Sequence, residues 1–340
     1  MNEHKGHTDC IVIILAAYNG ERFIREQILS IQAQTHDKWQ LLISDDGSTD
    51  NTVSIIQEFC SNDHRILLTR DSEHTRVGAS ANFGRLMHHA LDTGADYVAF
   101  SDQDDVWKQD KLSSQLQVMK CIEARTGTRA PVLVYSDLEV VNQQLEQIHA
   151  SFMSYQGIPT KKNISLQTLL VQNFVTGCTM LVNRSLLQLA VPVPDTAHMH
   201  DWWVALCAAS YGVMEYMPAT TVQYRQHGEN ITGAGGIRRL KQISTWRSTL
   251  KKMNRIFVRS FQQAASLRKR ADMHGNDLIN SRINYNESIQ IMDRWISLPN
   301  LTIGDRFRTA LKEKIHSYNP VLTVLFYLQL VFLRRIARHD

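Results

Sequence analysis

The chain has 340 residues, of which 43% are hydrophobic and 21% are charged, an ordinary balance for a globular protein. This length allows two domains, or one large domain with an appendage, and the composition excludes wholesale disorder. The formal net charge of +4 conceals an asymmetry, because residues 1–237 carry 17 basic and 26 acidic side chains whereas residues 238–340 carry 20 and 7. An acidic front and a basic tail usually serve different purposes.

The five cysteines are far apart and form no CxxC pair, which argues against a disulfide framework or a structural zinc site. We therefore expect buried thiols in a reducing cytosol. No secretory signal is expected, because residues 1–10 are polar and the apolar run 11–17 is short and lacks a cleavage pattern. The sequence contains no run of 18 apolar residues, so no ordinary transmembrane helix is expected.

The first 130 residues alternate between strand and helix patterns. Short apolar runs predict strands, and apolar residues at helical spacing predict the helices between them. This alternation favours a mainly parallel sheet covered by helices. The expected strands are 11–17, 41–44, 66–68 and 97–100, and the expected helices are 22–34, 52–60, 79–91 and 110–122.

The pattern becomes less regular beyond Pro131. A polar, loop-rich stretch is expected between residues 142 and 165, and the glycine-rich stretch 233–236 predicts a linker or hinge. The elements expected in this part are strands at 132–135 and 179–182, a helix at 202–211 opened by His200 and Asp201, and long helices at about 238–272, 276–297 and 305–338.

Polar residues follow three of the predicted parallel strands. Tyr18 and Asn19 follow the first strand, Asp45 and Asp46 the second, and residues 101–105 the fourth. Ligands of open α/β sheets bind beyond the carboxyl ends of the strands, so we expect these groups to converge on one edge.

The segment Asp102-Gln103-Asp104-Asp105 gives the strongest single indication of chemistry. Three carboxylates within four residues repel one another unless a cation lies among them. Mg²⁺ or Mn²⁺ would bind such oxygen ligands and could bridge them to a diphosphate, where it would act as a Lewis acid. The alternative is a solvated acidic turn in which Asp105 caps the next helix.

Four segments together resemble glycosyltransferase family 2, and within it the bacterial rhamnosyltransferase-like branch. They are AAYNGERF (16–23), SDDGSTDNT (44–52), FSDQDDVWKQDKL (100–112) and HDWW (200–203), and YRQHGENITG (224–233) is also typical of that branch. The resemblance covers about residues 10–235 and implies the GT-A fold. It also implies an inverting transferase that uses a nucleotide-sugar donor.

The resemblance implies a donor site built from the strand ends. Tyr18 and its neighbours would pack against the base, and Asp46 would accept a hydrogen bond from the N3–H of uracil or thymine. Arg76 resembles a family arginine near the nucleotide, although an ordinary surface arginine is an even alternative. The full expected donor-binding set is Ala17, Tyr18, Asn19, Glu21, Asp46, Arg76, Asp102 and Gln103, with Asp102 at the ribose.

The resemblance also implies the remaining roles. Asp104 would bind the metal, and His227 would supply a further ligand or touch the diphosphate. Asp201 would be the general base that deprotonates the acceptor hydroxyl, although it also suits a helix N-cap. The expected acceptor-binding residues are Gly177, His200, Trp202 and Trp203, with core packing as the alternative for at least one tryptophan.

We expect an α/β protein with a GT-A type, mainly parallel sheet flanked by helices and a C-terminal helical subdomain. The catalytic domain would span residues 1–235, with a nucleotide-binding part (10–130) and an acceptor-binding part (131–235). Residues 236–340 would form a basic helical region. Its apolar stretch 321–333, followed by arginines, favours either contact with a membrane surface or packing on the catalytic domain.

The expected reaction is metal-dependent transfer of L-rhamnose from dTDP-L-rhamnose to an oligosaccharide or lipid-diphosphate-linked acceptor in bacterial surface polysaccharide synthesis. The enzyme would be cytoplasmic, or peripheral at the inner face of the plasma membrane. Alternatives are another UDP- or dTDP-sugar (glucose, galactose or GlcNAc), a sugar-phosphate nucleotidyltransferase, or a non-catalytic binding protein. A nucleic-acid partner is not expected, because no recognised binding motif accompanies the basic tail.

Overall fold

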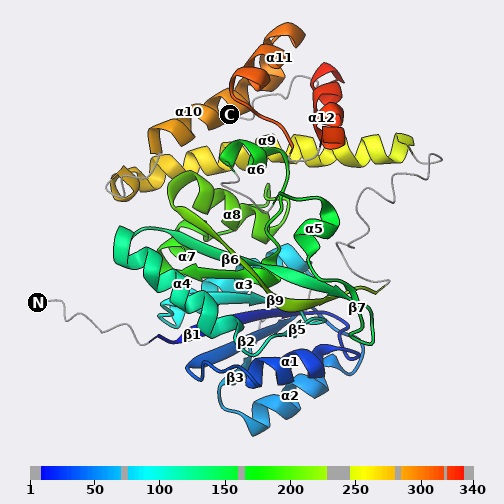
Figure 1. The fold of residues 1–340 in the computed structure, drawn as a ribbon. Coiled ribbons are helices and arrows are strands. Elements are labelled where there is room, and N and C mark those ends of the chain that lie inside the picture. Colours follow the sequence, from blue (N-terminus) through cyan, green and yellow to red (C-terminus); the bar gives the residue numbers. More distant parts are fainter. Residues whose placement is uncertain are drawn as a thin grey trace, which may run out of the picture. The chain divides into compact units, whose positions relative to one another are not determined.

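The computed structural model describes residues 9–69, 76–159, 165–227, 246–279, 285–317 and 320–332 (Figure 1). The chain divides into two units that interleave along the sequence. The first unit comprises residues 1–152, 175–193 and 213–234, and the second comprises 153–174, 194–212 and 235–340. The expected linear division at residue 235 therefore differs from the contact-based one, and the functional meaning of the expected parts stays a prediction.

The first unit is built on one mixed sheet with the strand order β3-β2-β1-β4-β8-β6-β9-β5, and β7 pairs with β6. The first four strands in this order are parallel, as the alternating pattern predicts. The apolar side chains of β1, β2 and β4 are almost fully buried because helices cover the sheet, whereas Leu67 at the edge strand β3 is exposed. These strands are β1 (Ile11–Ala17), β2 (Trp39–Asp45), β3 (Ile66–Leu68) and β4 (Tyr97–Ser101), and the helices between them are α1 (Ile24–Gln32), α2 (Thr52–Asn62) and α3 (Ala79–Asp92).

The other half of the sheet mixes both orientations. Strand β8 runs antiparallel to β4 and β6, β9 is parallel to β6, and β5 is antiparallel to β9. The strands are β5 (Val106–Trp107), β6 (Val132–Val141), β7 (Gln147–His149), β8 (Met180–Asn183) and β9 (Val213–Arg225). The helical elements here are α4 (Lys111–Thr126), α7 (Arg184–Ala190) and the 3₁₀ turn η1 (Gly177–Thr179), while α5 (Phe152–Gln156) spans the boundary between the units.

The second unit is helical, and an aromatic cluster forms part of its core. Trp295 is fully buried and stacks on Phe261 and Phe326, with Phe257 packed edge-on. The elements are α6 (Leu166–Val171), α8 (His200–Tyr211), α9 (Trp246–Ile279), α10 (Tyr285–Ser297), η4 (Leu298–Asn300), α11 (Ile303–Lys312) and α12 (Pro320–Phe332). None of the helices in the described ranges is long and apolar enough to cross a membrane.

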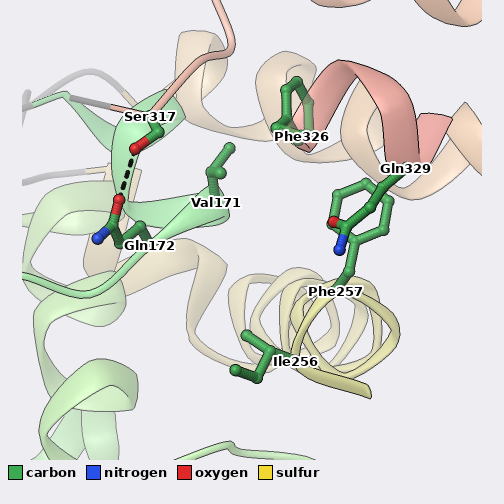
Figure 2. A pocket seen from close by; sticks show the side chains of 7 residues that line it. All are labelled: Val171, Gln172, Ile256, Phe257, Ser317, Phe326 and Gln329. Carbon is green, nitrogen blue, oxygen red and sulfur yellow. Dashed lines mark hydrogen bonds between the residues drawn. The ribbon is translucent and has the colours of Figure 1, made fainter. Parts of the chain in front are cut away.

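A cavity of about 170 Å³ lies beside this cluster, between α6, α9 and α12 (Figure 2). Its wall is mainly apolar, and the Ser317 hydroxyl donates to Gln172 Oε1 at one side (2.6 Å). The lining residues are Val171, Gln172, Ile256, Phe257, Ser317, Phe326 and Gln329.

One expectation about the later elements is corrected, and another is refined. The single helix expected over residues 305–338 is two helices, because the chain turns at Lys314 (φ 53°) and α12 begins only at Pro320. The stretch 142–165, expected to be rich in loops, also contains the short strand β7 and the whole of the short helix α5. The glycine-rich segment 233–236, residues 238–245 and the arginines after 333 lie outside the described residues.

Candidate functional site

Two loops that follow adjacent parallel strands are hydrogen-bonded to each other. The first loop (residues 18–21) follows β1, and the second loop (residues 46–52) follows β2. The N–H of Asn19 donates to Ser48 Oγ (2.8 Å), and Glu21 Oε2 accepts a backbone N–H of the second loop (2.9 Å). Asn19 has φ 47°, a left-handed conformation that asparagine tolerates better than most residues. These bonds fix both loops at the carboxyl edge of the sheet.

Gln103 joins the first loop to the turn that follows β4. The N–H of Tyr18 donates to Gln103 Oε1 (2.8 Å), and Gln103 Nε2 donates to the Tyr18 carbonyl (2.9 Å). Gly20 makes room for this amide, because a Cβ at that position would lie 2.4 Å from Gln103 Oε1. Gln103, which the sequence places in the donor site, thus positions the backbone of Tyr18.

Asp46 holds the segment that carries Arg76. Its carboxylate is buried and accepts the N–H groups of Val77 (2.7 Å) and Gly78 (2.8 Å), one on each oxygen. The Arg76 guanidinium lies 3.9 Å from the centre of the Tyr18 ring. A carboxylate has about four acceptor positions, so Asp46 retains the capacity to accept a further donor. Three residues expected at the nucleotide are therefore neighbours in the first unit.

The acidic turn after β4 contacts the end of β9. Asp104 Oδ2 lies 2.7 Å from His227 Nε2, and both side chains are largely buried. Asp102 and Asp105 of the same turn, together with Cys178, place possible ligand atoms within 4.8 Å of one another. The two expected metal ligands, Asp104 and His227, are thus adjacent.

Arg225 connects this turn to the start of α1. It is only 1% exposed, its Nε donates to the Asp104 carbonyl (2.9 Å), and its guanidinium forms an ion pair with Glu26 of α1. The same guanidinium lies over the Phe23 ring, 4.6 Å from its centre. The His227 ring packs against Phe23 as well, with ring centres 5.0 Å apart. Arg225 and Phe23 therefore fix the backbone of Asp104 and the ring of His227.

Asp105 belongs to a fully buried polar cluster beneath the turn. Burial, together with the neighbouring carboxylates, raises the pKa of Asp105 well above its usual range. Burial likewise raises the pKa of the Cys178 thiol and lowers that of Lys111 to about 7. Asp105 Oδ1 accepts the Arg225 N–H (3.2 Å). Asp105 therefore supports β9, and the solvated, helix-capping alternative for this residue is wrong.

Asp201 and His200 lie in the second unit, in the first turn of α8. The N-cap position is Met199, so Asp201 is not the N-cap of this helix. Asp201 Oδ1 accepts the N–H of Trp202 (2.6 Å). Burial lowers the pKa of His200 to about 3, so its imidazole is neutral at ordinary pH.

Trp202 and Trp203 are buried within the same helix. Trp202 is 3% exposed and donates its indole N–H to the Leu169 carbonyl (2.7 Å), while Trp203 is fully buried with Arg270 packed over its ring. This burial favours the packing role that the sequence also allowed. A direct contact of either tryptophan, or of the buried His200, with an acceptor stays a prediction.

Gly177 lies in the first unit, at the start of the buried turn η1, and its expected role at the acceptor also stays a prediction. Sequence reasoning missed Phe23, Glu26 and Arg225, which support the acidic turn. Two signals were available, because Phe23 and Arg225 both lie within the quoted motifs AAYNGERF and YRQHGENITG. Glu26 lies outside every motif.

The model of the family "Glycosyl transferase family 2" matches residues 12–189, more than half of the chain. The chain belongs to glycosyltransferase family 2. It is a transferase, and the resemblance inferred from its motifs is confirmed.

Three named bacterial relatives are sugar transferases. The dTDP-rhamnosyl transferase RfbG of Shigella flexneri is 28% identical over 65% of this chain and 74% of its own length. The putative teichuronic acid biosynthesis glycosyltransferase TuaG of Bacillus subtilis is 28% identical over 60% of this chain and 76% of its own. A third relative is the Escherichia coli protein UDP-Glc:alpha-D-GlcNAc-diphosphoundecaprenol beta-1,3-glucosyltransferase WfgD. It is 31% identical over 52% of this chain and 61% of its own length.

The fold agrees with this family. The mannosyltransferase PcManGT from Pyrobaculum calidifontis, solved with GDP-Man and Mn²⁺, superposes with a TM-score of 0.50 at 16% identity, covering 97% of this chain and 88% of its own. The expected GT-A fold is therefore confirmed.

Proposed function

We propose that this family 2 glycosyltransferase catalyses metal-dependent, inverting transfer of a sugar, L-rhamnose from dTDP-L-rhamnose, to a glycan acceptor in bacterial surface polysaccharide synthesis. The observation that carries the proposal is the joined pair of strand-end loops, with Tyr18, Asp46 and Arg76 at one end and Asp104 beside His227 at the other. The named rhamnosyl transferase relative supports the choice of donor.

The nucleotide would bind against the first loop. Asp46 would accept the imide N–H of thymine or uracil through its remaining acceptor capacity. Tyr18 and Arg76 offer a ring and a planar cation, both suited to stacking on a base. Asp102 and Gln103 would contact the ribose. Ala17, Asn19 and Glu21 would form the floor of the nucleotide site.

The donor set of the acidic turn fits a divalent cation. Asp104 Oδ2 and His227 Nε2 lie within hydrogen-bond distance of each other. Arg225 donates to the Asp104 carbonyl, and the Phe23 ring packs against His227, so both residues are positioned by neighbours. A carboxylate oxygen and an imidazole nitrogen suit Mn²⁺, while Mg²⁺ prefers oxygen ligands alone. When bound, the cation supplies Lewis-acid stabilisation for the negative charge of the departing nucleoside diphosphate.

Asp201 would accept the proton of the attacking acceptor hydroxyl. An inverting transfer needs one such base, and the carboxylate in the first turn of α8 has an oxygen already oriented by the Trp202 N–H. The adjacent His200 is buried and neutral, so it carries no positive charge that would oppose protonation of Asp201.

The acceptor would be a lipid-diphosphate-linked glycan, handled by a cytoplasmic enzyme at the inner face of the plasma membrane. WfgD, whose name states a diphosphoundecaprenol-linked acceptor, supports this class of acceptor. A donor carrying another sugar on UDP or dTDP, such as glucose, galactose or GlcNAc, is the second candidate, because relatives with different donors are similarly distant.

The deciding experiment is a panel of nucleotide sugars with purified protein and Mg²⁺ or Mn²⁺, scored for release of nucleoside diphosphate. We expect dTDP-L-rhamnose to give the highest turnover and EDTA to abolish it. Release from another donor would replace the sugar but keep the reaction, whereas undiminished turnover in EDTA would exclude the metal role. Pyrophosphate formed from a sugar phosphate and a nucleoside triphosphate would instead identify a nucleotidyltransferase.

The roles of Asp201 and Asp104 need variants with matched controls. Asp201→Asn should lower turnover at least 100-fold with little change in donor affinity, since a general base contributes about 10²–10⁴-fold. Asp195→Asn, an exposed position in the same unit, is its control. Asp104→Asn should weaken Mn²⁺ binding measured by calorimetry, whereas the exposed Asp110→Asn should not. Full activity of Asp201→Asn would overturn its assignment.

A further inference from the structure

Helix α12 presents an apolar face to the surface of the second unit. Val324, Leu328 and Val331 are 59%, 50% and 38% exposed, and they follow one another at intervals of four and three residues. This spacing places them on one side of a helix. The opposite side carries Phe326 and Leu330, which are 2% and 0% exposed.

Helix α11 extends this apolar face. Ile303 and Leu311 are 50% and 64% exposed and share a helix side with Phe307. The Phe307 ring stacks on Tyr327 of α12, with centres 5.7 Å apart and planes 12° from parallel. The exposed residues of α11 therefore join those of α12 through this aromatic pair. We call the two helix faces together the α11–α12 face.

Basic side chains accompany the α11–α12 face. The Arg308 side chain is 80% exposed and pairs with Asp305 (2.7 Å), while Lys312 at the end of α11 and Lys314 just beyond it are exposed. They belong to the C-terminal part of the chain in which 20 basic side chains outnumber 7 acidic ones. Exposed apolar residues beside excess positive charge are typical of helices that lie in the interface of an anionic membrane.

We infer that the α11–α12 face docks on a bilayer containing anionic lipid, with its apolar residues inserted at the level of the headgroups. Charge favours this occupant over a second copy of the chain, because two such basic regions repel each other whereas an anionic surface attracts one. The inference rests on the proposed function only for its setting, since a lipid-linked acceptor requires the enzyme at a membrane.

The test is flotation of the 340-residue chain with vesicles of phosphatidylcholine and phosphatidylglycerol, without donor or acceptor. Wild-type protein should float with these vesicles and much less with pure phosphatidylcholine. Leu328→Glu should lower the partition coefficient at least tenfold, because it removes an inserted apolar group and adds a negative charge.

The matched control is Leu29→Glu, the same change at an equally exposed (50%) position on α1. It should leave flotation unchanged. Absence of wild-type flotation, or equal flotation of Leu328→Glu, would overturn the inference, as would a dimer that Leu328→Glu dissociates without any vesicle binding. Since the assay needs no sugar transfer, it can fail while the proposed reaction stands, and the reverse also holds.

Discussion

Gly20 sets how closely the first loop approaches the turn after β4. The two hydrogen bonds between Tyr18 and Gln103 require that approach, because the Gln103 amide occupies the space of a side chain at position 20. The loop that carries Tyr18 and the turn that carries Asp102 and Asp104 are thereby held as one piece.

We predict that Gly20→Ala weakens donor binding at least tenfold, because the added methyl group displaces Gln103 and frees the Tyr18 loop. Calorimetric titration with dTDP and Mn²⁺ measures this effect. Gly84→Ala in α3 is the control, since its added Cβ meets Val193 at an ordinary 3.6 Å and alanine favours a helix. Equal affinities for Gly20→Ala and wild type would contradict the positioning role.

His200 makes stability depend on pH. Its pKa of about 3 in the folded protein lies below the ordinary value of 6.5, so the unfolded chain binds the proton first. The contribution of neutral His200 to the free energy of unfolding is complete above pH 6.5. It is lost as pH falls towards 3, by up to about 1.4 kcal/mol per pH unit. Urea unfolding followed by tryptophan fluorescence should show a shallower loss between pH 6.5 and 4.5 in His200→Gln than in wild type.

The matched control for this pH effect is His88→Gln on α3, where the imidazole is 66% exposed and should leave the wild-type slope unchanged. Parallel pH dependence in all three proteins would show that another group dominates acid unfolding.

Residues of the site differ in how far the sequence predicted them. Tyr18, Asp46, Asp104 and His227 carry their own chemistry within recognisable motifs. The structure places Tyr18 against Arg76, Asp46 against the backbone that follows Arg76, and Asp104 against His227. Glu26 was not predicted, because an acidic residue on a helix has no special pattern and gains its meaning only from the buried Arg225. Long-range partners of this kind are invisible to local spacing.

Among the elements, β9 was missed although it is 13 residues long. Its sequence contains Pro218, and a proline cannot donate to a sheet, which makes the strand hard to recognise from the sequence. The pairing with β6 jumps from Ser136–Met217 to Asp137–Thr220, so Pro218 falls in an irregularity of the register and needs no ladder partner. The break between α11 and α12 did have a signal, since Asn319-Pro320 is a turn dipeptide and proline favours the first turn of a helix.

The aromatic cluster that holds α9, α10 and α12 together centres on Trp295. We predict that Trp295→Ala lowers the free energy of unfolding by about 3–5 kcal/mol, because it empties a fully buried site next to the existing cavity. Trp295→Phe should cost much less, since it keeps the ring stacking and removes an indole N–H that has no partner among the described residues. Urea unfolding of both variants tests this order, and equal losses would contradict the packing account.

At the scale of the whole molecule, the interleaved units set what can be removed. Helices α6 and α8 come from segments before residue 235, yet they belong to the same unit as α9 and α10. The Tyr211 hydroxyl of α8 donates to the Leu267 carbonyl of α9 (3.1 Å), and Thr196 bonds Ser266 (2.8 Å). The composition changes near residue 237, close to the unit boundary at residues 234–235, but the second unit also includes segments from before that boundary.

We predict that a fragment of residues 1–235 does not form a stable, monodisperse protein, because it exposes the apolar side of α8. Size-exclusion chromatography and binding of a hydrophobic dye should reveal aggregation or a loosely packed state. A cooperative melting transition in a monomeric fragment would show that the first 235 residues fold independently.

The interleaving also has a consequence during synthesis on the ribosome. Helix α8, which is buried along most of its length in the folded unit, leaves the exit tunnel before α9 and α10 have emerged. At about 5–20 residues per second, the nascent chain waits for several seconds with this segment unprotected. We therefore predict that co-expression of a chaperone that binds apolar nascent segments raises the soluble yield of this protein.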